Sequence, residues 1–332
     1  MARVCLKDIA EMLNISESTV SRALSNKPGV SPDLREMVFK VAQDLNYPFK
    51  LLRKHQTCMT TAIIVPDVSN PFFATVSYGI ASVLRTAGHL TFIANTDEDF
   101  ELEEEHIHSL MERGINGIIA APTAGAAELY REVVRAGMPL VFIDRVHEGV
   151  QAPSVTIDNR DAMFQAVRSL VGVGHRRICL VAGDPQIYTG RERSEGFLEA
   201  VGILGLNKDD CPVVHGLFKE PEAYSVSKDV LRAKRCTAII ATSNKTTCGV
   251  LRAIRELNLR MPADISLVGF DDQDWTRFFD PPISAIRQPA FTMGVLAGNL
   301  LLQAVDGKPG SENTVLKAEL VWRESVGRVE RG

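Results

Sequence analysis

The sequence predicts a small all-α unit at the N-terminus, followed by a large α/β body made of two lobes. Three observations lead to this fold class. Apolar residues recur at helical spacing over the first 47 residues, short apolar runs alternate with helical stretches from residue 62 onward, and this alternation restarts near Asp158. A chain of 332 residues is also longer than one ordinary domain and can bury a sizeable core.

Charge and cysteine usage narrow the classes of protein. Residues 1–60 hold nine Lys and Arg against six acidic residues, whereas the remaining 272 residues hold 28 basic and 35 acidic residues. A basic head on an acidic body points to nucleic acid as a partner of the head. The six cysteines form no Cys-x-x-Cys pair, and neither a leader nor an apolar run of about 18 residues is present, which predicts a cytoplasmic, soluble protein with reduced cysteines.

Three short amphipathic helices are expected within the first domain, residues 1–47. Asn14-Ile15-Ser16 breaks the first helix from the second, with Ser16 placed to cap the second helix and Glu17 at its positive end. Ser31 and Pro32 begin the third helix as its cap and first helical residue. A helix, a turn of about three residues and a second helix form the helix-turn-helix arrangement, which presents the second helix to the major groove of DNA.

The second helix carries hydroxyl and guanidinium groups that match phosphate oxygens and base edges. Glu17 and Ser18 would face base edges, because this helix enters the groove by its N-terminal end. The alternative is a solvated face of a small helical bundle, but the basic charge and the turn favour DNA. The candidate DNA-binding residues of the domain are Ser16, Glu17, Ser18, Thr19, Ser21, Arg22 and Asn26.

The stretch "LKDIAEMLNISESTVSRALSNKPGVSPDLREMVFKVAQDLNY" resembles the N-terminal domain of the LacI/GalR family of bacterial transcription factors. The matching elements are "DIA", "STVSRALSN", "VS" before "LRE", and "LNY", in this order. The resemblance implies that residues 48–61 are a hinge that folds on DNA, with Leu51 or Leu52 wedged into the minor groove beside Arg53. The family's usual Pro-Asn and Ala-Arg-x-Leu are absent here, and a plain basic linker is the alternative.

The body, residues 62–332, contains ten short apolar runs, from "AIIVPD" to "ISAIRQP", separated by stretches of helical period. This alternation predicts parallel sheets covered on both faces. Ten strands are too many for one open sheet of ordinary size, so we expect lobe 1 at about 62–157 and 289–320 and lobe 2 at about 158–286. A ligand should bind between the lobes at the C-terminal ends of the strands.

Sequence motifs of nucleotide-dependent enzymes and hydrolases are missing from the body. It contains no Gly-x-Gly-x-x-Gly after a strand, no phosphate loop and no Gly-x-Ser-x-Gly elbow. His106 and His108 lie two residues apart, which places them on different faces of a helix and argues against a metal site. We therefore expect no catalytic residues, no metal and no cofactor.

Polar residues end several of the apolar runs, where they could hydrogen-bond a hydroxylated ligand, and aromatic residues nearby could cover its apolar face. Taken singly, each could equally be a helix cap or the edge of a core. Their recurrence at one edge of the sheets predicts a ligand site. The polar candidates are Asp67, Asp144, Asn244 and Asp271, and the aromatic candidates are Phe72, Phe73, Tyr224 and Trp275.

The body also resembles the effector domain of the same family, which is itself similar to periplasmic sugar-binding proteins. The matching stretches include "VPDVSNPFFATVSYGI", "FIDR", "GRERSEGF", "ATSN" and "PADISLVGFDD". The resemblance implies that Arg191 contacts the effector while Arg193 braces its helix, and that Asp144, Asn244 and Asp271 are effector contacts. It likewise implies that Phe73, Tyr224 and Trp275 are wall or stacking residues.

Lys245 replaces an acidic residue of the family beside the expected pocket, because this chain has Asn244-Lys245 where members usually have Asn-Asp. A cation there suggests a sugar acid or sugar phosphate, with Lys245 and Arg191 meeting the anion.

The combined prediction is a homodimeric transcriptional regulator that binds a pseudo-palindromic operator and is switched by a sugar-like effector, and the resemblance implies that it is a repressor. The helix at 72–88 is a candidate dimer surface. A sugar-binding transport protein and a sugar-converting enzyme are the alternatives. The first needs a secretory leader and no basic head, and the second needs a base or metal constellation that is not found.

Overall fold

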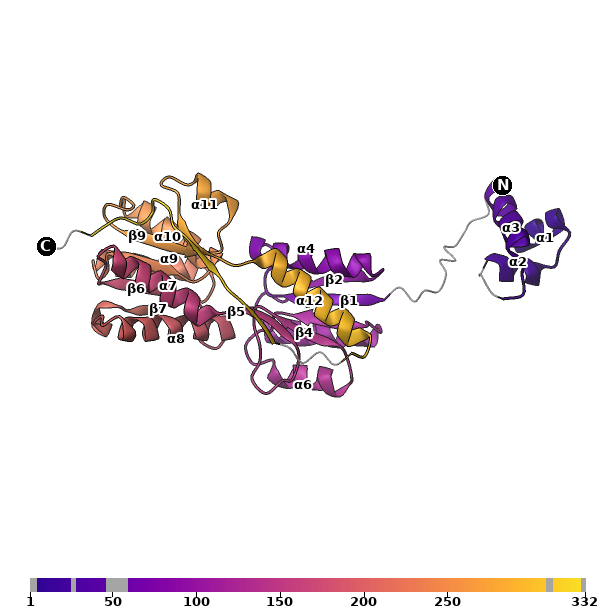
Figure 1. Ribbon diagram of the computed structural model, residues 1–332, viewed down its shortest axis with the longest axis horizontal. Helices are drawn as coiled ribbons and strands as arrows, with labels where there is room; N and C mark the ends of the chain where they lie inside the picture. The colour runs from indigo at the N-terminus through magenta and orange to yellow at the C-terminus, as the bar shows by residue number, and fades with distance from the viewer. Residues whose placement is uncertain (1–4, 25–27, 46–58, 309–312, 330–332) are drawn as a thin grey trace. The chain divides into compact units, whose positions relative to one another are not determined.

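The computed structural model describes residues 5–24, 28–45, 59–308 and 313–329. The chain forms two compact units, an N-terminal unit that ends at Cys58 and a body that begins at Met59 (Figure 1). Asn26 and the predicted hinge residues Leu51, Leu52 and Arg53 lie outside the described residues.

The N-terminal unit consists of α1 (Leu6–Leu13), α2 (Glu17–Leu24) and α3 (Pro32–Asp44), which pack against one another as the sequence predicts. Asn14 adopts a left-handed conformation with φ 51° and ends α1. The hydroxyl oxygens of Ser16 and Ser31 accept hydrogen bonds from the backbone N–H groups of Thr19 (3.2 Å) and Leu34 (3.3 Å), which caps the next two helices. The core of the unit is formed by Ile9, Ala10, Val20, Ala23, Leu24, Val38 and Ala42.

Each lobe of the body is built on a six-stranded sheet. The first sheet has the order β11 (Asn313–Leu316), β5 (Ser154–Ile157), β4 (Leu140–Ile143), β3 (Gly117–Ala120), β1 (Thr60–Val65) and β2 (Leu90–Asn95). The second has the order β12 (Glu319–Val321), β10 (Ser284–Arg287), β9 (Ser266–Phe270), β8 (Ala238–Ala241), β6 (Ile178–Ala182) and β7 (Val213–His215). The strand pairs are parallel except for β12, which runs antiparallel to β10.

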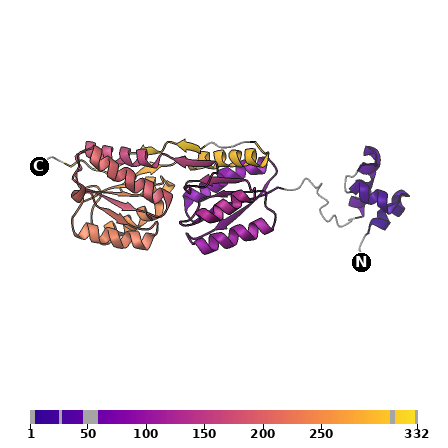
Figure 2. The ribbon, with the colours of Figure 1, turned by 90° about the horizontal axis from the view of Figure 1, so that it is seen from below.

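Helices cover both faces of each sheet (Figure 2). In lobe 1 the pair α4 (Pro71–Thr86) and α12 (Ala290–Val305) covers one face, and α5 (Phe100–Glu112) and α6 (Ala127–Arg135) cover the other. In lobe 2 the corresponding pairs are α7 (Asn159–Gly172) with α8 (Tyr188–Ile203), and α9 (Glu220–Arg232) with α10 (Asn244–Glu256). The central strands are consequently buried along their whole length, which explains their continuous apolar runs.

The chain passes from one lobe to the other after β5, after β10 and after β11 (Figure 1). A short helix, α11 (Asp274–Phe278), follows β9 in lobe 2. Asp67 follows β1, Asp144 follows β4 and Asp271 follows β9, so the loops at the carboxyl ends of these strands carry the predicted polar residues. A single buried cluster includes core residues of both lobes, for example Ile63 and Leu301 of lobe 1 and Phe197 of lobe 2.

Candidate DNA interface and ligand site

The helix α2 has one buried face and one polar face. Val20, Ala23 and Leu24 are buried in the core of the N-terminal unit. The Ser16 hydroxyl lies 2.8 Å from the hydroxyls of Ser18 and Thr19, so the beginning of the helix is lined with hydroxyl groups. Ser16, Glu17, Ser18, Ser21 and Arg22 are exposed and Thr19 is half-buried. The structure thus collects the predicted DNA-binding residues that it describes at one end and one side of α2.

A cavity of about 150 Å³ lies between the two lobes of the body, at the carboxyl ends of the strands. Residues of both lobes line it, from the loops after β1, β4, β8 and β9 and from the first turns of α4 and α8. Among the predicted ligand-binding residues, the structure brings together Asp67, Phe72, Phe73, Asp144, Lys245 and Asp271.

Asp144 and Asp271 are the two buried carboxylates of the cavity. Each follows a strand in a left-handed conformation, with φ 64° and 66°, and each backbone N–H extends the sheet by bonding the next strand, at Val155 and Ile286 (both 2.9 Å). Burial raises the pKa of both carboxyls, and the nearby charge of Arg193 opposes this rise. A polar partner inside the cavity is therefore favourable for both groups.

Arg193 enters the cavity from α8. Its Nε donates to Asn159 Oδ1 and its Nη1 donates to the carbonyl oxygen of Thr242, both at 2.7 Å. Its guanidinium carbon lies 3.9 Å from the ring centroid of Phe270. Nη2 is 3.9 Å from Asp144 Oδ1 and has no hydrogen-bond partner among the described residues. Arg193 therefore links α8 to Asn159 and Thr242, and it keeps one buried N–H group without a hydrogen bond among the described residues.

Arg145 contributes a second guanidinium group to the cavity, from lobe 1. Nη1 and Nη2 each donate to one oxygen of Glu98, at 2.7 Å, and the guanidinium carbon lies 5.9 Å and 5.7 Å from the rings of Phe73 and Phe218. Burial by itself would lower the pKa of Arg145, but the charge and hydrogen bonds of Glu98, together with the charges of Asp144 and Glu103, outweigh burial and raise it. Arg145 Nε is 3.4 Å from Asp144 Oδ2 and makes no hydrogen bond with any described residue.

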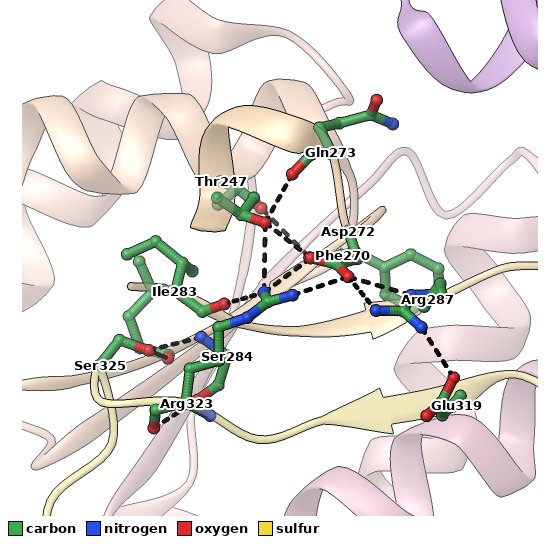
Figure 3. Close-up of polar contacts among 12 residues, drawn as sticks. Thr247, Phe270, Asp272, Gln273, Ile283, Ser284, Arg287, Glu319, Arg323 and Ser325 are labelled. Carbon is green, nitrogen blue, oxygen red and sulfur yellow. Dashed lines mark hydrogen bonds and ion pairs between the residues drawn. The ribbon is translucent and has the colours of Figure 1, made fainter. Parts of the chain in front are cut away.

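The segment that carries Asp271 is anchored through its neighbour, Asp272 (Figure 3). Arg323 donates from Nη1 to Asp272 Oδ1 (2.6 Å) and from Nη2 to Oδ2 (2.9 Å), and Arg287 Nη2 donates to Oδ2 at 2.6 Å. Burial would raise the pKa of Asp272, but these bonds and that of the Thr276 hydroxyl hold it well below its usual range. The last residue of β10 and the stretch after the edge strand β12 thereby position the end of β9.

The remaining predicted ligand residues lie outside the cavity lining. Arg191 is half-exposed and donates to Glu148 (2.7 Å), because it lies two residues from Arg193 and so on another side of α8. Tyr224 bonds Glu256 on the surface of α10, with Arg252 stacked 4.3 Å from its ring centroid. Trp275 packs against Phe279 beside a lobe 2 core cluster. Asn244 is buried next to the cavity, and its backbone N–H donates to Asp271 Oδ2 (3.3 Å).

Sequence reasoning did not select several lining residues, namely Asn70, Glu98, Arg145, Thr189, Phe218 and Gln288, and it assigned Arg193 only a bracing role. Helical spacing contains a signal for Arg193, because it lies four and seven residues before the buried Phe197 and Ala200 on α8. Phe218 has no such signal, since it belongs to a loop whose Leu217 and Phe218 both have positive φ.

Three buried polar atoms in residues that line the cavity make no hydrogen bond with described residues: Arg145 Nε, Arg193 Nη2 and Gln288 Oε1. Two of them are donors, and the third is an acceptor whose amide nitrogen is engaged with Asp271 (2.8 Å). Leaving such groups unpaired costs free energy, so the cavity favours a ligand that both accepts and donates hydrogen bonds. No group of three or more His, Cys, Asp or Glu in the described ranges could hold a metal ion.

Two family models match the chain. Residues 5–48 match the bacterial regulatory proteins of the lacI family, and residues 167–326 match the periplasmic binding protein-like domain. Among the described residues, no helix combines the length and the apolar character needed to cross a membrane.

Curated relatives match the chain over almost its whole length. The chain is 33% identical to the HTH-type transcriptional regulator MalR of Streptomyces coelicolor, over 98% of both chains. It is 30% identical to the HTH-type transcriptional repressor CytR of Escherichia coli, over 97% of this chain and 96% of CytR. Among solved structures, the complex of the transcriptional regulator CelR with cellobiose aligns with a TM-score of 0.74 at 28% identity, covering 97% of this chain and all of CelR.

Proposed function

The chain belongs to the LacI family of bacterial regulatory proteins, and we propose that it is a cytoplasmic repressor that binds a pseudo-palindromic operator as a homodimer. A small sugar bound between the lobes controls its affinity for the operator. The effector does so through its different affinities for two arrangements of the lobes, because a ligand shifts an equilibrium only by that difference. The protein binds its sugar without converting it.

The polar face of α2 supports the DNA part of this proposal. Its exposed hydroxyls and Arg22 match phosphate oxygens and base edges. Ser16 and Ser18 lie at the N-terminal end of the helix, which is the end that a recognition helix presents to bases, and Arg22 lies in its last turn. A homodimer presents two such helices, so the operator should have two related half-sites.

The buried atoms of Arg145, Arg193 and Gln288 that make no hydrogen bond with described residues carry the effector part of the proposal. Sugar hydroxyls both donate and accept, and can therefore provide acceptors for the two donors and a donor for the acceptor. The rings of Phe72 and Phe73, which pack edge to face at 5.0 Å, supply the apolar wall that the carbon face of a sugar needs. A volume of about 150 Å³ is below the roughly 300–1,000 Å³ of pockets for drug-sized ligands, which favours a small sugar.

The charges around the cavity favour a neutral sugar over the sugar acid suggested by Lys245. Five carboxylates and four basic side chains line the cavity. Lys245, the residue that suggested an anion, already lies 3.2 Å from Asp67 Oδ2, and Arg145 is paired with Glu98. An anionic ligand would add negative charge to a site that is already compensated. Calorimetry with matched sugars and sugar acids decides between them, and binding of the acids alone would restore the anionic alternative.

Selection of genomic DNA fragments on the purified protein tests the proposed function directly. At near-physiological salt, sequencing of the bound fragments should reveal an enriched pseudo-palindrome, and the adjacent genes would indicate the sugar. The Arg22→Ala variant should recover the same motif weakly, while its unfolding midpoint stays that of the wild type. Binding without sequence preference, in the presence and absence of sugars, would contradict the proposal.

A further inference from the structure

Among the described residues, two partly exposed ion pairs join the lobes, in addition to the buried pair of Arg193 and Asp144. Lys245 Nζ, at the start of α10 in lobe 2, lies 3.2 Å from Asp67 Oδ2 and 3.2 Å from the Ser69 hydroxyl, in the lobe 1 loop between β1 and α4. Arg191 Nη2 in lobe 2 lies 2.7 Å from Glu148 Oε1, in the lobe 1 loop between β4 and β5. Charged side chains thus connect loops of one lobe to helices of the other.

The pair of Lys245 and Asp67 lies at the mouth of the cavity. Both residues line the cavity, and their side chains remain 36% and 33% exposed, so the pair stands where the cavity meets solvent. Any ligand that enters past this point must pass the pair or separate it.

Asp67 is held in position for its partner within lobe 1. Its Oδ1 accepts hydrogen bonds from the backbone N–H (2.8 Å) and the hydroxyl (2.6 Å) of Ser69, which leaves Oδ2 for Lys245. Burial would raise the pKa of Asp67, but the bonds from Ser69 and Lys245 outweigh burial and lower it. The carboxylate is therefore ionised and oriented at neutral pH.

Lys245 stands in an unfavourable place within its own helix. It is the second residue of α10, two residues after the cap Ser243, whose hydroxyl accepts from the N–H of Thr246 at 3.1 Å. The positive end of the helix dipole disfavours a cation in the first turn. The stability of α10 therefore does not explain a lysine at this position. The carboxylate of Asp67 from the opposite lobe offsets the repulsion between Lys245 and the helix dipole.

We propose that Lys245 and Asp67 form a gate that holds the lobes together across the mouth of the cavity before any effector is bound, with Arg191 and Glu148 as a second tie. Entry of an effector requires this gate to open, so the gate sets how readily and how large a ligand enters. The inference goes beyond the proposed function, because it concerns the protein without effector or DNA.

Chemical access to the cavity tests the gate without knowledge of the effector. Thr189 lines the cavity and is buried, so in the full-length Thr189→Cys protein the alkylation of this cysteine by iodoacetamide, followed by peptide mass spectrometry, reports opening. Adding Lys245→Ala should accelerate alkylation about two- to five-fold, the range expected for one partly exposed ion pair. High salt should accelerate the reaction with Lys245 present and much less without it.

Two further variants separate the gate from a general loosening. Exchanging the charges, with Asp67→Lys and Lys245→Asp together, should restore slow alkylation, whereas Asp67→Lys alone should accelerate it. Arg252→Ala is the matched control, because it removes an ion pair (Arg252 with Glu220, 3.1 Å) from the same helix within lobe 2 alone and should leave the rate unchanged.

Equal alkylation rates with and without Lys245, or a charge exchange that fails to restore protection, would overturn the gate. If Thr189→Cys does not fold, the radius of gyration from small-angle scattering provides the same comparison, with a larger value expected for Lys245→Ala. Neither measurement uses DNA or a sugar, so a result that contradicts the gate can be distinguished from one that contradicts the proposed regulatory function.

Discussion

Asp271 and Asp272 show how two adjacent, chemically identical residues acquire opposite roles. The Asp271 carboxyl lies in the cavity with Gln288 as its side-chain partner, and burial raises its pKa. The Asp272 carboxyl meets two arginines, which hold its pKa low despite burial. Asp271 thus provides a buried carboxyl group that a ligand could contact, and Asp272 holds in place the segment that carries Asp271.

These opposite shifts predict opposite pH profiles of stability. A depressed folded pKa contributes stability that is fully present above the unfolded value of about 3.9 and is lost only as pH falls through the folded pKa, so Asp272→Asn should cost about 1.5–3 kcal/mol near pH 7 and a smaller amount at pH 3, where only part of the contribution is lost. A raised folded pKa contributes stability below about 3.9 that is lost as pH rises, so Asp271→Asn should improve relative to the wild type with increasing pH. Urea denaturation from pH 3 to pH 8 measures both, and parallel profiles would contradict this account.

The two arginines of "GRERSEGF" mark the limit of what the sequence predicts for single residues. The motif locates α8 and an arginine near the ligand, but Arg191 and Arg193 differ only in the side of the helix on which they lie. The buried stripe through Phe197 and Ala200 selects Arg193. Phe218 was beyond prediction from the sequence, because its place depends on a loop conformation and on contacts with Arg145 from the other lobe.

At the scale of elements, the sequence predicted those strands that form clear apolar runs separated by stretches of helical period. The ten apolar runs correspond to β1 through β10, since parallel strands buried on both faces are nearly continuous in apolar residues. The edge strands β11 and β12 were not predicted. They are short and contain only exposed and half-buried residues, and their pairing with β5 and β10 depends on the chain crossing between lobes.

The contact between α4 and α12 is set by glycines. A Cβ on Gly294 would lie 2.2 Å from the carbonyl oxygen of Val76, and one on Gly79 would lie 2.5 Å from that of Phe291. Because backbone atoms cannot yield as side chains do, Gly294→Ala should lower the free energy of unfolding of the body by about 1–3 kcal/mol. Gly202→Ala in α8 meets no atom within 4 Å and serves as the control, with an unchanged or slightly higher value in urea denaturation. An equal effect of both substitutions would contradict the packing argument.

The edge strand β2 is the best candidate for the dimer surface. Leu90, Phe92 and Ile93 are exposed on this strand, and an exposed apolar edge tends to pair with another chain. The predicted helix surface, α4, adds the exposed Tyr78.

Phe92→Glu should therefore produce a monomer in sedimentation equilibrium. It should also weaken operator binding about 100-fold or more, because two linked heads bind far more tightly than one. Glu132 is exposed on α6, on the opposite face of the lobe 1 sheet from α4, and offers a matched control as Glu132→Lys, which should leave the dimer intact. If the Phe92→Glu protein is still a dimer, the dimer interface does not include β2.

At the scale of the whole molecule, the two units have separate cores of very different size. The apolar cluster of the N-terminal unit is formed by residues 6–45, whereas the clusters of the body begin at Ala62. Small domains bury a smaller fraction of their surface and are correspondingly less stable. The unit that binds DNA should therefore unfold more easily than the unit that binds the effector.

Heating should consequently unfold the protein in two steps rather than one. Both tryptophans, Trp275 and Trp322, lie in the body, so tryptophan fluorescence follows the body alone, whereas far-ultraviolet circular dichroism also follows α1 to α3. The dichroism curve should show an earlier partial loss of helix that fluorescence does not register. A DNA fragment at 100 times its dissociation constant should stabilise only this first step, by about 2.7 kcal/mol, because it binds the folded N-terminal unit. Coincident curves with and without DNA would instead require the two units to unfold as one.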